Sequence, residues 1–367
     1  WLLTIMSTEA RIHRWIRPDI IDLEPYHVPD ARGMTKLDAM ENPYTWPREL
    51  RDLWLQRLAE TPLNRYPDAA ANELRTSLAS WCHLNSASEV LLGNGSDELI
   101  QILALALGGT RRTILAPEPT FVMYRLAAKY TGTDYVGVSS SDALAPDLEA
   151  LLQAIETHKP SCVFLAHPNN PTGGMIETQT VEAVIAATDG LVVVDEAYHA
   201  FCGHSYANLL PKYDNLVVMR TFSKLGLAGL RLGFLIGPRE WLGVLDRIRL
   251  PYNINALTQA SALFALEHMA WFEERASEIC VERAALSQRL SELPGVELFP
   301  SAANFLLFRV GHGCAGAVFD GLCKKKVLIK NLHGTHPSLV DCLRVTIGTA
   351  EQNGVFFNAL KEQLAAD

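Results

Sequence analysis

Residues 161–198 read SCVFLAHPNNPTGGMIETQTVEAVIAATDGLVVVDEAY, and this stretch decides the fold class. Two short apolar runs, CVFLA and LVVVD, flank a segment around VEAVIAAT that has a helical pattern. Strands that are apolar throughout are typical of a parallel sheet covered on both faces. The stretch therefore predicts one β-α-β unit of an α/β domain.

The same alternation extends outward from this unit, over about residues 90–240. Upstream, VLLG precedes SDELIQILALAL and TILAPEP precedes TFVMYRLAAKY; downstream, NLVVMRTFSK contains a further apolar strand. Polar, glycine-rich segments follow these strands directly: GNGSD, HPNNPTGG, DEAY and TFSKLGLAGLR. Because ligands of open α/β sheets bind beyond the carboxyl ends of the strands, these segments form the candidate site.

The composition indicates a globular protein with a small-molecule partner. Of the 367 residues, 49% are hydrophobic and 20% are charged, which excludes a disordered chain and a disulfide-rich miniprotein. The formal net charge is −9, whereas nucleic acids and anionic membranes require a concentrated positive face. We therefore expect no nucleic-acid partner and no membrane partner.

Two further features favour a cytoplasmic protein. No apolar run approaches the roughly 18 residues that cross a bilayer, and the opening WLLTIM lacks the basic segment and cleavage site of a signal peptide. The seven cysteines show neither CxxC nor Cys/His ligand spacing. We therefore expect reduced thiols and no metal site.

The pattern divides the chain into an arm and two domains. Residues 1–41 contain a basic, aromatic segment, RIHRWIR, and then prolines that prevent a long helix, so we expect an amphipathic arm docked on the protein itself. Residues 42–250 are the large α/β domain. After Pro251 a long helical stretch over residues 256–293 leads to short strands and helices, which predicts a small α+β domain over residues 251–367.

Lys224 is the first candidate for covalent chemistry. It follows an apolar strand, and Gly226, Ala228 and Gly229 after it let the backbone approach a ligand closely. A lysine in a crowded pocket can lose its proton and attack a carbonyl group, whereas a lysine in an ordinary loop stays solvated. Both interpretations are open for Lys224 taken alone.

Asp195 is the candidate anion of the same region, because it closes the run LVVVD and its carboxylate emerges at the carboxyl edge of the sheet. A charge there is costly unless it meets a cation or a bound group, although an aspartate that caps the next turn is an equal alternative. Tyr198 can bring a phenol to this edge. Asn170 could donate its amide to a phenolic oxygen, although NNPTG is also a good turn sequence.

The segment GNGSDE, residues 93–98, predicts an anion site. It opens a helix directly after a strand, so the free N–H groups of Gly95, Ser96 and Asp97 can face an anion at the positive helix end. Ser96 could instead serve only as the helix N-cap. The segment is neither a Walker loop nor a dinucleotide fingerprint, which disfavours ATP and NAD.

Eight short segments carry information on the family: ENPY (41–44), RYPD (65–68), GNGSDE (93–98), PTFVMY (119–124), HPNNPTG (167–173), DEAY (195–198), FSKLGLAGLR (222–231) and LRVTIGT (343–349). In this order they resemble the fold-type I pyridoxal-phosphate aminotransferases, and within them the histidinol-phosphate aminotransferases. The resemblance covers nearly the whole chain past residue 35. It implies a large domain with a mostly parallel seven-stranded sheet covered by helices, and a smaller α+β domain.

The resemblance implies pyridoxal 5'-phosphate as the cofactor and a role for most candidate residues. Lys224 resembles the lysine that holds the cofactor covalently and moves the proton at the substrate Cα. Asp195 resembles the partner of the ring nitrogen, and Tyr198 and Asn170 resemble the pair that bonds the ring oxygen. Phe121 occupies the place of the aromatic ring that stacks on the cofactor. The cofactor phosphate would be held by Gly95, Ser96, Asp97, Ser223 and Arg231.

Other residues are implied to act between subunits or on the substrate. Tyr66 of RYPD would reach the cofactor phosphate of the neighbouring subunit, which implies a homodimer with shared active sites. Arg344 resembles the arginine that binds the glutamate carboxylate and the substrate phosphate in turn. Lys330 fits either a second anion-binding position or the basic surface patch before it. Tyr26 and Asn42 are implied substrate contacts.

The implied reaction is transamination of histidinol phosphate with 2-oxoglutarate, giving imidazole acetol phosphate and glutamate in histidine biosynthesis. An aromatic amino-acid aminotransferase and a threonine-phosphate decarboxylase share the segments and stay open as alternatives. A regulator with an aminotransferase-like domain would need a DNA-binding domain in front, and an arm of residues 1–41 is too short for one. A purely structural role would leave a lysine, an aspartate and an arginine at strand ends without explanation.

Overall fold

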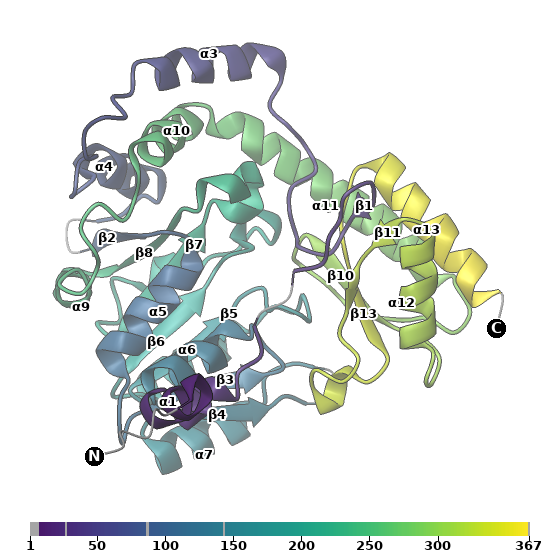
Figure 1. Ribbon diagram of the computed structural model, residues 1–367, viewed down its shortest axis with the longest axis horizontal. Helices are drawn as coiled ribbons and strands as arrows, with labels where there is room; N and C mark the ends of the chain where they lie inside the picture. Colours follow the sequence, from purple (N-terminus) through teal and green to yellow (C-terminus); the bar gives the residue numbers. More distant parts are fainter. Residues whose placement is uncertain (1–6, 26–27, 86–87, 142–143, 366–367) are drawn as a thin grey trace.

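The computed structural model describes residues 7–25, 28–85, 88–141 and 144–365. Tyr26 and the opening WLLTIM lie outside these residues. The chain forms a large lobe around one sheet and a smaller lobe that contains the C-terminal helix (Figure 1).

The large lobe contains the sheet expected from the sequence. Its strand order is β2-β8-β7-β6-β5-β3-β4, and β8 is antiparallel to both of its neighbours, whereas the other pairs are parallel. The mostly parallel seven-stranded sheet is therefore confirmed. The strands are β2 (Ser88–Gly93), β3 (Thr113–Glu118), β4 (Asp134–Ser139), β5 (Cys162–Ala166), β6 (Leu191–Asp195), β7 (Leu216–Thr221) and β8 (Gly233–Pro238).

The apolar-run pattern did not identify β4 and β8 as individual strands. β4 is the edge strand and is partly exposed, so its sequence DYVGVS is not a continuous apolar run. β8 begins at Gly233, two residues after the polar, glycine-rich segment that ends at Arg231, and its sequence GFLIGP contains an apolar run of only three residues, FLI.

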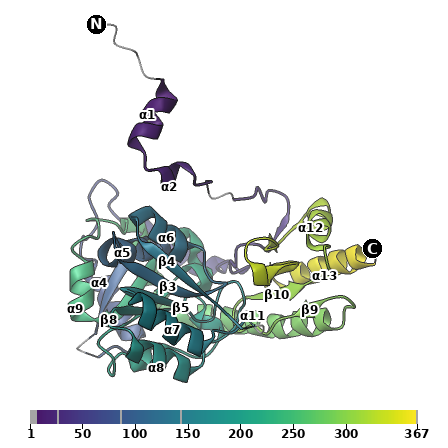
Figure 2. The ribbon, with the colours of Figure 1, turned by 90° about the horizontal axis from the view of Figure 1, so that it is seen from below.

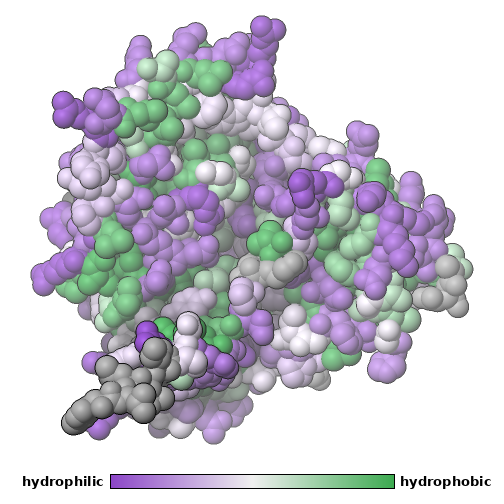
Figure 3. All heavy atoms as spheres, viewed as in Figure 1, coloured by the Kyte–Doolittle hydropathy of each residue, from purple (hydrophilic) through white to green (hydrophobic). Residues whose placement is uncertain are grey.

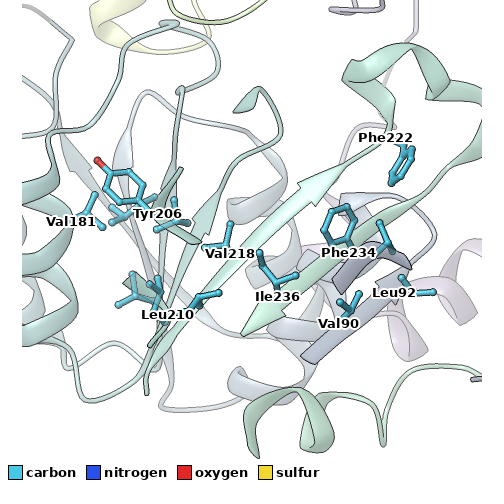
Figure 4. Packing of buried hydrophobic residues seen from close by; sticks show 14 of the residues in the cluster. Val90, Leu92, Val181, Tyr206, Leu210, Val218, Phe222, Phe234 and Ile236 are labelled. Carbon is cyan, nitrogen blue, oxygen red and sulfur yellow. The ribbon is translucent and has the colours of Figure 1, made fainter. Parts of the chain in front are cut away.

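Helices and buried side chains cover both faces of this sheet. In β6, Val192 and Val194 belong to one hydrophobic cluster, whereas Leu191 and Val193 belong to another. Figure 4 shows the first cluster, where Val218 lies near β8 side chains. The helices of this lobe are α3 (Arg48–Ala59), α4 (Asn72–Trp81), α5 (Ser96–Leu107), α6 (Met123–Thr131), α7 (Leu148–His158), α8 (Thr178–Ala187), α9 (Arg239–Leu245) and α10 (Ala256–Glu267), with the short turns η1 (His199–Phe201), η2 (Tyr206–Leu209), η3 (Ser223–Leu227) and η4 (Ala228–Leu230).

The small lobe is an α+β unit, as expected. Its main sheet has the order β12-β13-β10-β9 and is antiparallel, and β1 (Thr35–Lys36) pairs separately with β11. The elements are α11 (Met269–Ser291), β9 (Glu297–Leu298), β10 (Phe305–Arg309), α12 (Ala315–Lys324), β11 (Val327–Leu328), β12 (Lys330–Asn331), η5 (Pro337–Leu339), β13 (Cys342–Thr346) and α13 (Ala350–Leu364).

The helical stretch expected over residues 256–293 is divided at His268 into α10 and α11. Met269 and Phe272, at the start of α11, belong to a buried cluster of the large lobe. The buried residues of α11 from Ala276 onward belong to the cluster of the small lobe. The hydrophobic clusters therefore divide within α11, and the boundary after residue 250 stays a prediction.

The N-terminal arm docks less than expected. Helix α1 (Thr8–Trp15) has no buried residue and extends away from the body of the protein (Figure 2). After α1, Arg17 donates to the carbonyl oxygens of Tyr130 (3.0 Å) and Lys129 (2.7 Å) in the last turn of α6, and α2 (Pro18–Ile21) follows. The predicted docking of RIHRWIR is therefore wrong in that the helix buries none of its residues, whereas Arg17 does dock on α6.

Candidate functional site

Three neighbouring strands of the large sheet end at one cavity. Ala166 ends β5, Asp195 ends β6 and Thr221 ends β7, and all three line a cavity of ≈ 230 Å³. This is the carboxyl edge of the parallel strands, where α/β proteins bind ligands. Besides Asp195, the predicted residues that line the cavity are Ser96, Asp97, Phe121, Asn170, Tyr198, Ser223, Lys224 and Arg231, whereas Gly95 is not among its lining residues.

Lys224 presents its amine inside this cavity rather than to bulk water. The Nζ atom donates to the carbonyl of Ala39 (3.1 Å) and lies 5.7 Å from the centre of the Tyr198 ring. Burial, followed by the positive charge of Arg344, lowers the pKa of Lys224 to about 8. More of this amine is neutral near pH 7 than in an ordinary lysine, which suits attack on a carbonyl group.

Asn42 supports the turn that carries Lys224. Its Nδ2 atom donates to the carbonyl of Leu225 (3.0 Å). Gly226, in the same turn, has φ +123°, and a Cβ there would lie 3.3 Å from Nδ2 of Asn42. Glycine at this position therefore allows both the backbone conformation and the close approach.

Asp195 has a hydrogen-bond donor on each carboxylate oxygen. Oδ1 accepts from the backbone N–H of Ala197 (3.0 Å), and Oδ2 accepts from the Tyr124 hydroxyl (2.7 Å). Burial raises the pKa of Asp195 to about 6, and the hydrogen bond from Tyr124 opposes that rise. Asp195 thus caps the following turn and also lines the cavity, so the two interpretations from the sequence are compatible.

The N-terminus of α5 forms an anion cradle with Arg231. Gly95 is the N-cap at φ +81°, and a Cβ there would lie 2.5 Å from the Arg231 guanidinium. Ser96 is the first helical residue, and the N-cap makes no side-chain hydrogen bond, so the interpretation of Ser96 as N-cap is wrong. Arg231 lies 3.1 Å from an Asp97 oxygen and donates to the Ser223 hydroxyl (3.4 Å). Helix N–H groups, hydroxyls and a guanidinium suit a phosphate group.

Asn170 and Tyr198 place two potential donors at the cavity. The side-chain oxygen of Asn170 accepts from Arg344, so its NH₂ group is the end that can donate to a ligand. Burial raises the pKa of Tyr198, so its phenol stays protonated at neutral pH. Phe121 presents an aromatic ring to the same cavity and packs edge-on against Tyr124 (5.8 Å, 87°).

Arg344 connects the small lobe to this site. It lies on β13, is 6% exposed, and donates to Asn170 and to the carbonyl of Asp38 (3.0 Å). Lys330 lies directly opposite Arg344 in the β12–β13 register, and opposed residues share one face of a sheet. Neither residue lines the cavity in the described part of the chain, so their substrate contacts stay predictions.

Two predicted site residues lie elsewhere. Tyr66 is 79% exposed and stacks on Tyr252 (4.4 Å, 19°), and it does not line the cavity of its own chain. Asn42 holds the Lys224 turn instead of lining the cavity. A further predicted residue, Tyr26, is outside the described residues.

Thr221 and Tyr124 are two polar residues at the site that sequence reasoning missed. Thr221 lines the cavity, and its hydroxyl donates to Ser223 (3.0 Å). Tyr124 bonds Asp195 from behind the cavity.

Other kinds of site are absent from the described residues. Within them, no group of three or more His, Cys, Asp or Glu side chains could hold a metal ion. None of the helices found there is both long and apolar enough to span a membrane.

The sequence matches one family over most of its length. The family model for aminotransferase class I and II matches residues 32–360, so the chain belongs to this family. Among curated proteins, it is similar to histidinol-phosphate aminotransferase 2 of Nitrosococcus oceani, at 51% identity over 354 residues, which are 96% of this chain and 98% of the relative. It is also similar to histidinol-phosphate aminotransferase 1 of Ralstonia nicotianae, at 46% identity over 363 residues, 98% and 96% of the two chains.

A solved structure has the same fold. It is the histidinol-phosphate aminotransferase from Sinorhizobium meliloti in complex with pyridoxal-5'-phosphate, with a TM-score of 0.86 and 24% sequence identity. The match covers 95% of this chain and 97% of that one, so both lobes are shared.

Proposed function

We propose that this chain is a pyridoxal-phosphate-dependent aminotransferase that transfers the amino group of histidinol phosphate to 2-oxoglutarate. The observation that carries the reaction class is the meeting of Lys224, Asp195 and the anion cradle at one cavity. The identity of 46–51% to histidinol-phosphate aminotransferases over nearly the whole chain supports the substrate. The products would be imidazole acetol phosphate and glutamate, as in histidine biosynthesis.

The residues present fit this cofactor. When bound, pyridoxal 5'-phosphate supplies an aldehyde that bonds to amines and an electron-withdrawing ring. The Gly95 cradle, with Arg231, would hold its phosphate, because a Cβ at position 95 would fill that space. Asp195 would hold a proton on the ring nitrogen, and the Asn170 amide and the Tyr198 phenol would donate to the ring oxygen.

Lys224 acts as the mobile base and acid. Its amine, with a pKa of about 8 in the cofactor-free chain, would take the proton from the substrate Cα as a base and give it back as an acid. Arg344 binds the substrate anion, because a guanidinium pairs bidentately with either a carboxylate or a phosphate. Its present partners, Asn170 and the carbonyl of Asp38, place it at the boundary between the lobes.

A substrate comparison tests the proposal. Purified protein is supplied with 2-oxoglutarate and, separately, histidinol phosphate, phenylalanine or threonine phosphate. We expect kcat/KM for histidinol phosphate to be about 100-fold higher than for phenylalanine, because Arg344 and Lys330, which lie opposite each other, offer two positive charges to a phosphate dianion, whereas a carboxylate carries one negative charge. Glutamate formation measures transamination, and CO₂ release measures decarboxylation. Preferred use of phenylalanine, or CO₂ from threonine phosphate, would replace the proposed substrate with one of the alternatives.

The proposal includes a homodimer. Tyr66 is far more exposed than a site residue should be and lies outside the cavity of its own chain, which is the expected position for a residue that serves a second subunit. Hydrophobic side chains interrupt the polar surface over α3 (Figure 3). Exposed apolar residues of this lobe include Leu53, Leu55, Leu63, Leu105, Val244 and Leu250. A surface of this kind fits burial against a second copy.

Mixing inactive subunits tests the shared site. Lys224→Ala and Tyr66→Ala subunits, exchanged in equal amounts, should recover about a quarter of the parental activity, because half of the dimers then carry one intact site. Lys224→Ala mixed with Asp195→Asn is the control, since both residues belong to one subunit's cavity and every site keeps a defect. No recovery in the first mixture, with subunit exchange demonstrated, would contradict a shared site.

The cytoplasm is the proposed location. All seven cysteines are unpaired, as is usual in a reducing compartment.

A further inference from the structure

Tyr124 is a buried polar residue that the proposed reaction has not used. It lies on α6 and is 0% exposed, and its hydroxyl donates to Oδ2 of Asp195 at 2.7 Å. Asp195 lines the cavity, whereas Tyr124 lies behind it. A buried phenol hydrogen-bonded to a buried carboxylate is a strong, charge-assisted contact when that carboxylate is ionised.

The position of the Tyr124 hydroxyl is fixed by packing. Its ring stacks on Phe164 of β5, with centroids 4.4 Å apart and planes 8° apart. Phe121, which lines the cavity, packs edge-on against the same ring, with centroids 5.8 Å apart and planes at 87°. The phenol thus has little freedom to turn away, and the direction of its O–H donation is set by the core of the large lobe.

We propose that Tyr124 is a positioning residue for the aminotransferase reaction: its hydroxyl fixes the direction of the Asp195 carboxylate and keeps that carboxylate ionised opposite the ring nitrogen. The inference rests on the proposed function, because the ring nitrogen belongs to the proposed cofactor. Tyr124 touches neither substrate nor cofactor in this scheme and acts through Asp195.

The electrostatics of the site require such a donor. Burial raises the pKa of Asp195, and the negative charges of Asp97 and Glu196 raise it further. The hydrogen bonds from Tyr124 and from the Ala197 N–H act in the opposite direction. Burial and the charge of Asp195 also raise the pKa of Tyr124, so the phenol remains a donor at every pH at which the enzyme would work.

Tyr124→Phe removes the hydroxyl and keeps the ring stacked on Phe164. Tyr206→Phe is the matched control, because Tyr206 is also buried (1% exposed) and its hydroxyl donates to the carbonyl of Ile176 (2.5 Å) rather than to Asp195. Each variant loses one buried phenolic hydrogen bond. Only the first changes the surroundings of the carboxylate.

The first readout is the ionisation of Asp195 itself, followed by carbon-13 NMR of labelled aspartate in the cofactor-free full chain. Asp195→Asn identifies the signal. We expect the midpoint of the Asp195 titration to rise by about one pH unit in Tyr124→Phe, the size typical of a lost hydrogen bond to a charged group, and to stay unchanged in Tyr206→Phe. An unchanged midpoint in Tyr124→Phe would overturn the inference.

The second readout is steady-state turnover of the holoenzyme. In Tyr124→Phe, kcat should fall by about tenfold with little change in KM, because the hydroxyl supports the reaction and not substrate binding. An equal loss in Tyr206→Phe would mean a merely structural effect and would also overturn the inference. Failure of the proposed function gives a different result: the parent chain would then show no cofactor-dependent turnover, while the NMR titration would still decide the role of Tyr124.

Discussion

Lys224→Ala should abolish transamination, with kcat lower by roughly 10⁴-fold or more, because one side chain both holds the cofactor and moves the proton at the substrate Cα. The variant should still bind pyridoxal 5'-phosphate through the cradle around Gly95 and Arg231. It should lack the visible absorbance of the covalently attached cofactor. After borohydride reduction it should still release the cofactor on denaturation, whereas the reduced parent keeps it. Absorbance spectra and single-turnover assays measure both effects.

Lys212→Ala is the control for this substitution. Lys212 forms an exposed ion pair with Glu182 and does not line the cavity, so its loss should leave kcat near the parental value. Parental turnover in Lys224→Ala would contradict the assignment of the base.

Asp195→Asn should lower kcat by roughly 10³-fold, because a neutral amide no longer holds the proton on the ring nitrogen against the buried surroundings. The substitution keeps the shape of the side chain, so cofactor binding through the cradle should persist. Steady-state kinetics with histidinol phosphate measure the loss. Asp246→Asn, which changes an exposed ion pair with Arg249, is the control and should stay near the parental rate.

The stability of Asp195→Asn separates a lost function from a lost fold. The pKa of Asp195 is about 6 in the folded, cofactor-free chain and 3.8 as its ordinary value, so the folded state binds more protons between these pH values. The free energy of unfolding contributed by this group therefore falls as pH rises from about 4 to 6. An asparagine side chain does not ionise, so the variant does not lose this contribution to the free energy of unfolding. At pH 7 the Tm of the cofactor-free variant should therefore equal or exceed that of the parent. A Tm well below that of the parent would show that the substitution damages the fold.

Much of the fold and site could be predicted because the deciding residues lie next to apolar strands. Asp195 ends β6 and Lys224 lies three positions after the end of β7, and neighbouring parallel strands bring such residues to one edge. The N-terminus of α5 could be predicted from Gly95 and the helix that follows. The roles of individual residues, however, came from the resemblance and stay predictions.

What the sequence hid depends on packing in three dimensions. Tyr124 reads as one more aromatic residue of a helix, and only the folded core brings it to a carboxylate 71 positions away. No proline or glycine marks the break at His268, and the residues on both sides are good helix formers. The sequence therefore predicts one continuous helix there. The exposure of α1 is equally hidden, because an amphipathic pattern does not state which surface it meets.

Strand β6 is apolar on both faces, so a slip of one residue would exchange Val192 and Val194 for Leu191 and Val193 with little loss of buried hydrophobic area. The two alignments of this strand bury nearly the same hydrophobic area, so hydrophobic burial alone does not distinguish them. The slip would carry Asp195 away from Tyr124, leaving the buried phenol without its acceptor and Oδ2 of Asp195 without its donor. The residue that serves the chemistry thereby also selects the alignment of the strand as the protein folds.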